Sequence, residues 1–97
     1  MKPSEALELH RDAIRHIVQS NSASNPRVFG SVIHGDDTED SDLDILVDEI
    51  EGRTTLISLA RIQVAIQSLT GVKADVLTPL ELHERFRASV VTEAQAV

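Results

Sequence analysis

Two short clusters in this chain, separated by ten residues, carry the groups needed to hold a metal-bound phosphate. The first is the pair Gly30-Ser31: glycine lets the backbone approach an anion closely, and serine adds a hydroxyl donor. The second is Asp42 and Asp44, whose two-residue spacing places both carboxylates on one face of an extended strand. Carboxylate oxygens are hard ligands that favour Mg²⁺ or Mn²⁺. Together the clusters predict a site for phosphoryl or nucleotidyl transfer from a metal–nucleoside triphosphate.

The elements that must bring the clusters together follow from the apolar pattern. It predicts helices over residues 4–20, 53–70 and 79–94, strands over 27–29, 43–47 and 72–77, and a helical turn over 32–34. Ser31 ends the first strand and Asp42 opens the second, so these strands must run antiparallel for the clusters to meet. A whole helix separates the second strand from the third, which indicates a right-handed parallel crossover. Asp75 in the third strand would then lie beside Asp42 and Asp44.

The predicted fold is a single α/β (α+β) domain over residues 1–97, with a small mixed three-stranded sheet and flanking helices. Clustered aspartates raise one another's pKa values, and a bound divalent cation removes that cost. Asp42, Asp44 and Asp75 are therefore the candidate metal ligands. The same acidic run imitates a calcium loop, but Ile45 occupies the position where such a loop needs glycine.

The composition limits the partners of the chain. Its formal net charge of −7 argues against direct binding of nucleic acid, which needs clustered Lys and Arg. Residues 36–51 hold nine carboxylates and no Lys or Arg, so this block is solvated, bound to cations or opposite a basic partner. There is no cysteine, which excludes disulfides and thiolate metal sites. No signal peptide and no apolar run of about 20 residues is visible, so we expect a cytoplasmic protein without a membrane span.

The spacing of the two clusters resembles a known signature. Gly30-Ser31, ten residues and then Asp42-Leu43-Asp44 is similar to the pattern of the polymerase-beta-like nucleotidyltransferase superfamily, and Asp75 falls where that family places its third carboxylate. The compact size resembles the minimal nucleotidyltransferases, the MNT antitoxins that are paired with HEPN-domain ribonuclease toxins. The resemblance implies the polymerase-beta-like nucleotidyltransferase fold.

The resemblance also implies a role for each residue of the pattern. Gly30 and Ser31 would hold the triphosphate. Asp42 and Asp44 would bind the metal ions, and Asp75 would complete the metal site and help to deprotonate the attacking hydroxyl.

The reaction implied by the MNT antitoxins is transfer of AMP from Mg-ATP to a tyrosine of the cognate toxin, which silences the toxin. Many relatives carry arginine where this chain has His34, a shorter side chain that is mostly neutral at pH 7. His34 is therefore either a phosphate contact or a residue that only fills the turn.

Two other functions stay open at this point. A non-catalytic antitoxin would neutralise its toxin by binding alone, with the acidic block opposite a basic ribonuclease surface. A small-molecule nucleotidyltransferase usually has a further domain for its acceptor, whereas residues 1–97 are predicted to form a single domain. We therefore expect the acceptor on another molecule. On the helix predicted over 53–70, Ile57 and Val64 lie off the main apolar stripe, which predicts a second apolar side facing a partner.

Overall fold

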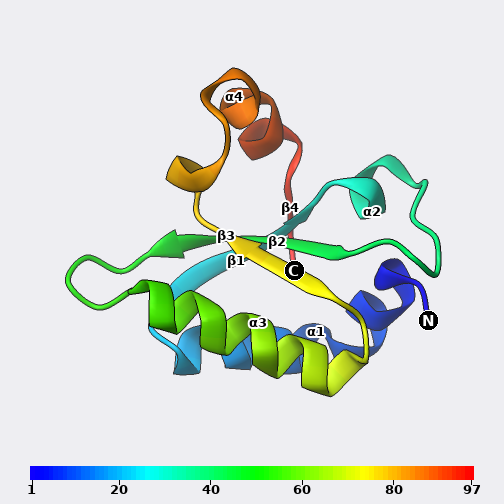
Figure 1. The fold of residues 1–97 in the computed structure, drawn as a ribbon, viewed down its shortest axis with the longest axis horizontal. Coiled ribbons are helices and arrows are strands. Elements are labelled where there is room, and N and C mark those ends of the chain that lie inside the picture. The colour runs from blue at the N-terminus through cyan, green and yellow to red at the C-terminus, as the bar shows by residue number, and fades with distance from the viewer.

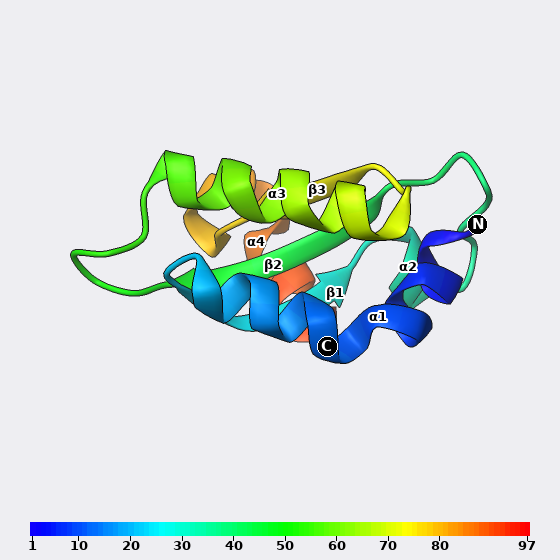
Figure 2. The same ribbon diagram turned by 90° about the horizontal axis from the view of Figure 1, so that it is seen from below.

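The fold is built around a mixed β-sheet. The computed structural model describes residues 1–97. The strands, in the spatial order β3-β2-β1-β4, are β1 (Ala23–Phe29), β2 (Leu43–Glu49), β3 (Ala74–Leu77) and β4 (Gln95–Ala96). The helices are α1 (Pro3–Ser20), α2 (Ser31–His34), α3 (Leu56–Thr70) and α4 (Glu84–Glu93), with a 3₁₀ turn η1 (Pro79–Glu81). Figure 1 shows α1 and α3 on one side of the sheet and α4 on the other. Seen from below in Figure 2, α1 and α3 lie side by side across the sheet.

The predicted strand directions are confirmed. β1 pairs with β2 in antiparallel orientation, and β2 pairs with β3 in parallel orientation. The connection between the parallel strands is α3, as Figure 1 shows. The helix begins at Leu56 rather than at residue 53, because the Thr55 hydroxyl caps it by accepting the N–H of Ser58 at 3.1 Å.

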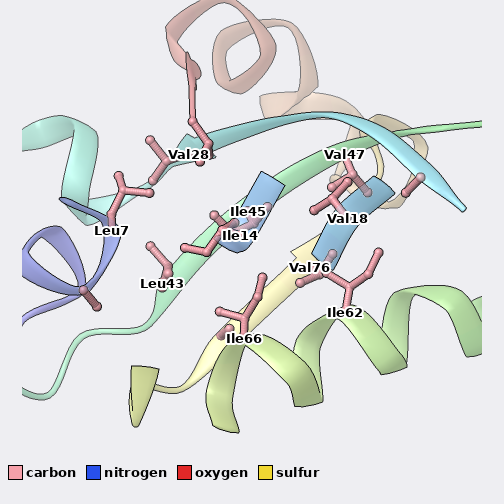
Figure 3. Close-up of a cluster of buried hydrophobic side chains, with 14 of the residues drawn as sticks. Leu7, Ile14, Val18, Val28, Leu43, Ile45, Val47, Ile62, Ile66 and Val76 are labelled. Atoms are coloured by element: carbon pink, nitrogen blue, oxygen red, sulfur yellow. The ribbon is translucent and has the colours of Figure 1, made fainter. Parts of the chain in front are cut away.

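The hydrophobic core lies between the sheet and the helices α1 and α3 (Figure 3). Alternate residues of β2 point into it, and all three are fully buried: Leu43, Ile45 and Val47. The facing helices contribute Ile14 and Val18 from α1 and Ile62 and Ile66 from α3. The intervening residues of β2 therefore face the opposite side of the sheet, as the two-residue alternation predicted.

The sheet has four strands, so the prediction of three was wrong. The added strand, β4, is only two residues long and pairs antiparallel with Arg27 and Val28 of β1. The N–H of Val97 extends the pairing by donating to the Pro26 carbonyl at 3.1 Å. Such a short strand has no periodic apolar pattern, and the chain there was expected to end a helix.

The first strand is also longer than predicted, because it begins at Ala23 rather than at residue 27. Asn25 and Pro26 lie between the helix predicted over 4–20 and the strand predicted over 27–29. A shift of the register between Ser24 and Arg27 accommodates them within the strand, with Asn25 at φ +49°. Proline is tolerated here because a bulge does not require its missing N–H.

The helix predicted over 79–94 is in fact two elements. Thr78 and Glu81 form a capping box, in which the Thr78 N–H donates to Glu81 Oε1 at 2.9 Å, but this box begins only η1. The backbone then becomes extended at Leu82. α4 starts afresh after His83, whose ring accepts the N–H of the residue two positions on at 3.1 Å.

Candidate active site

Gly30 brings the Gly-Ser turn into contact with β2. It follows the last residue of β1 with φ +76° and ψ −143°, a conformation that glycine alone adopts readily. Its missing side chain makes room for Asp44, since a Cβ at Gly30 would overlap the Asp44 carboxylate. Ser31 then begins α2, where the Gly30 carbonyl accepts the N–H of Ile33 at 3.1 Å and that of His34 at 3.3 Å. The two clusters recognised in the sequence are therefore neighbours in the fold.

Two of the three candidate carboxylates stand side by side on adjacent strands. The parallel register aligns Asp44 of β2 with Asp75 of β3. The flanking pair, Leu43 and Ala74, is fully buried in the core, so the two aspartates lie on the opposite face of the sheet. Asp42 immediately precedes β2 and shares this face by the same alternation.

The carboxylates on this face repel one another. The pKa of Asp44 is raised from 3.8 to about 6, first because the carboxyl group is removed from water, then because Asp75 and Asp42 add negative charge nearby. Ionisation of Asp44 is therefore costly in the folded protein. A positive ion placed among these carboxylates would relieve both causes at once.

The donor set suits a divalent cation that keeps some of its own water. No three acidic or histidine side chains form a ready-made metal cluster in this structure. Magnesium is typically bound by one or two carboxylates together with waters and substrate phosphates. The carboxylates of Asp42, Asp44 and Asp75, hard oxygen donors with surplus negative charge, fit an ion bound in that manner. When bound, such an ion would polarise a phosphate and offset the charge on its leaving group.

His34 contacts the last helix. Its Nε2 lies 3.0 Å from Glu93 Oε2, and both side chains are more than half exposed. In this structure, the imidazole thus connects the Gly-Ser turn to α4. Its predicted contact with phosphate stays a prediction.

Two contacts tie the acidic loop over residues 36–41 to the N-terminal segment, and one of them is an ion pair between the Met1 amino group and Glu39 Oε2 at 2.5 Å. Asp37 accepts the backbone N–H of Ser4 at 2.9 Å, and this hydrogen bond lowers the pKa of Asp37. Its neighbours Asp36, Glu39 and Asp40 are exposed. The loop is thus tied to the beginning of α1 while most of its charge faces solvent.

One charged neighbour of the site was not predicted. The Nζ of Lys73 lies 3.9 Å from Asp42 Oδ2. The sequence held the signal, because Lys73 stands two residues before Asp75 and so shares its face of the strand.

The Gly-Ser turn packed against paired carboxylates on a small mixed sheet is an arrangement suited to binding a nucleotide with its metal ion. The chain belongs to the family described as the nucleotidyltransferase domain, whose pattern matches residues 10–97. It is 31% identical over 78 residues to a protein of Methanocaldococcus jannaschii provisionally named protein adenylyltransferase MJ0435, covering 80% of this chain and 83% of the relative. It is 33% identical over 66 residues to protein adenylyltransferase MntA of Thermococcus cleftensis, covering 68% and 66%.

Solved structures agree with this assignment. A structure provisionally named as a minimal nucleotidyltransferase has 39% identity and a TM-score of 0.80, covering 97% of this chain and 93% of the other. A toxin–antitoxin crystal structure with AMP-PNP matches at a TM-score of 0.72 and 20% identity, covering 88% and 69%, which shows the shared fold. The predicted resemblance to the minimal nucleotidyltransferases is confirmed, and the protein is a nucleotidyltransferase.

None of its helices combines the length and apolar character that crossing a membrane requires.

Proposed function

We propose that this nucleotidyltransferase transfers AMP from Mg-ATP to a tyrosine hydroxyl of a cognate HEPN-domain ribonuclease toxin and so neutralises the toxin. The observation that carries the proposal is the packing of Gly30 against Asp44, with Asp75 aligned beside it. A phosphate held at the turn would lie next to the carboxylates that bind its metal. The names of two relatives, both protein adenylyltransferases, support AMP as the transferred group.

The proposed reaction exchanges one phosphorus–oxygen bond for another. The acceptor oxygen bonds to the α-phosphorus of ATP, the bond from that phosphorus to the β-phosphate oxygen breaks, and pyrophosphate leaves. The hydroxyl proton passes to a carboxylate, for which Asp75 is the candidate. Gly30 and Ser31 hold the triphosphate in line for this attack, while Asp42 and Asp44 hold the divalent cation.

Two surfaces support a protein as the acceptor. The exposed carboxylates of the acidic loop offer a negative surface to a basic partner. On α3, Ile57 and Val64 are 65% and 60% exposed and line a shallow hollow on the side away from the buried stripe. Both surfaces would also serve the second candidate function, neutralisation of the toxin by binding without catalysis. The costly ionisation of Asp44 favours the catalytic function, because binding alone does not require a partly buried carboxylate beside two others.

Labelled nucleotides separate the two functions. The protein is incubated with the partner toxin, Mg²⁺ and ATP labelled either at the α- or at the γ-phosphate. Adenylyl transfer leaves label on the toxin only from the α-position, and Asp42→Asn should abolish it while the complex still forms on gel filtration. A stable complex that acquires no label from either nucleotide would establish binding alone.

A further inference from the structure

Lys73 is fixed beside the carboxylates by the backbone of the sheet. The N–H of Leu43 donates to the Lys73 carbonyl at 2.8 Å, which places Lys73 next to Asp42, two residues before the aligned pair Asp44 and Asp75. Its side chain lies on the same face as these aspartates, with Nζ 3.9 Å from Asp42 Oδ2. This end of the face therefore presents three carboxylates and one ammonium, whereas Asp48 and Arg27 pair with each other further along β2.

No other lysine or arginine forms an ion pair with these three aspartates. The other paired basic side chains neutralise acids elsewhere: Arg11 with Glu8, Arg15 with Asp12, and Arg27 with Asp48. Arg87 donates to the backbone carbonyls of Pro79, Leu80 and Leu82. Among the basic side chains, only Lys73 lies within ion-pair distance of one of these carboxylates.

The ammonium of Lys73 is free to change partners. Its distance of 3.9 Å from Asp42 exceeds that of a hydrogen bond, and the Lys73 side chain is 72% exposed. Lysine carries a compact charge on a flexible stem, so a small rotation redirects its three donors. A lysine with a purely structural role would instead be buried and hydrogen-bonded.

We propose that Lys73 is a positioning residue that binds a phosphate oxygen of the metal-bound nucleoside triphosphate. This inference rests on the proposed function. In the absence of ligand, the ammonium offsets the charge of Asp42. With a divalent cation on Asp42, the Lys73 ammonium would be repelled from that carboxylate and would turn to the phosphate oxygens, where negative charge is still unpaired.

The test measures ligand binding rather than turnover. Isothermal titration of Mg²⁺–AMP-PNP and of Mg²⁺–tripolyphosphate is compared for wild type, Lys73→Gln, Lys73→Arg and the control Arg53→Gln. Arg53 is exposed in the loop that leaves the far end of β2, so its removal changes net charge equally without touching the site. Melting temperatures near that of wild type confirm that each variant is folded.

We expect Lys73→Gln to lower the affinity for both Mg²⁺ complexes about tenfold, because it removes a charge-assisted hydrogen bond. Lys73→Arg should restore part of the affinity, and Arg53→Gln should match wild type. Binding of Mg²⁺ alone should be no weaker in Lys73→Gln, because the ammonium competes with the cation for Asp42. Unchanged affinity of Lys73→Gln for both Mg²⁺ complexes would overturn this inference alone. A wild-type protein that binds neither complex would overturn the proposed function together with it.

Discussion

Replacement of Asp44 by asparagine should make the metal-free protein more stable at neutral pH. Burial, followed by the charges of Asp75 and Asp42, raises the pKa of Asp44 to about 6, above the 3.8 expected when the chain is unfolded. The folded protein therefore binds this proton more tightly than the unfolded chain does. The stabilising contribution is complete below pH 3.8 and is lost as the pH rises through about 6.

The size of the effect follows from the displacement of the pKa. Two pKa units correspond to about 3 kcal/mol at 1.36 kcal/mol per unit. Because Asp44 is only partly buried, solvent screening reduces this to about 1–2 kcal/mol. For a domain of this length, the melting temperature of Asp44→Asn should exceed that of wild type by about 5–10 °C at pH 7.

Thermal melts between pH 4 and pH 8, in the presence of a chelator, measure the difference between variant and wild type. The difference should grow from pH 4 to about pH 7 and then level off, since wild-type Asp44, with its pKa of about 6, is half ionised at pH 6 and almost fully ionised about one pH unit higher. Glu49→Gln, an exposed carboxylate at the end of the same strand, is the matched control and should show no such pH-dependent gain. An Asp44→Asn protein that is less stable than wild type at pH 7, or a difference independent of pH, would refute the charge-strain reasoning.

Four further predictions use the same geometry. Gly30→Ala should cost about 1–3 kcal/mol in thermal melts, because it adds backbone strain and overlaps the Asp44 carboxylate, whereas Gly52→Ala, with φ +74° but open space around it, should cost less. Glu93→Gln should change stability by less than about 0.5 kcal/mol, since its pair with His34 is exposed. If the His34 ring contacts phosphate, His34→Ala should weaken Mg²⁺–AMP-PNP binding in titration calorimetry. An affinity equal to that of wild type would show that His34 only fills the turn. Added Mg²⁺ at ten times its dissociation constant should stabilise wild type by about 1.4 kcal/mol and leave the melting of Asp44→Asn unchanged.

The three aspartates of the candidate site were accessible from the sequence because two of them follow a local rule and the third follows from the strand topology. Two-residue alternation placed Asp42 and Asp44 on one face, and the need for the clusters to meet required antiparallel strands. The crossover helix then required a parallel third strand, which aligned Asp75 with Asp44. Asp75 therefore followed from topology.

The features that the sequence did not predict depend on tertiary contacts. β4 exists only because β1 offers an unpaired edge to a two-residue segment. The bulge around Pro26 and the extended residue Leu82 reverse local signals that favour a loop and a continuous helix. The contact between His34 and Glu93 joins positions 59 residues apart. No periodicity encodes such a contact.

Intact-mass spectrometry of the partner toxin tests the central claim most directly. The toxin is incubated with this protein, Mg²⁺ and ATP, and in parallel with Asp42→Asn, whose loss of a carboxylate should remove metal binding. The account predicts that wild type increases the mass of the toxin by one or more AMP units, located on a tyrosine by fragmentation, and that Asp42→Asn leaves the mass unchanged. A toxin that is neutralised in a stable complex with wild-type protein, yet keeps its original mass, would contradict the account.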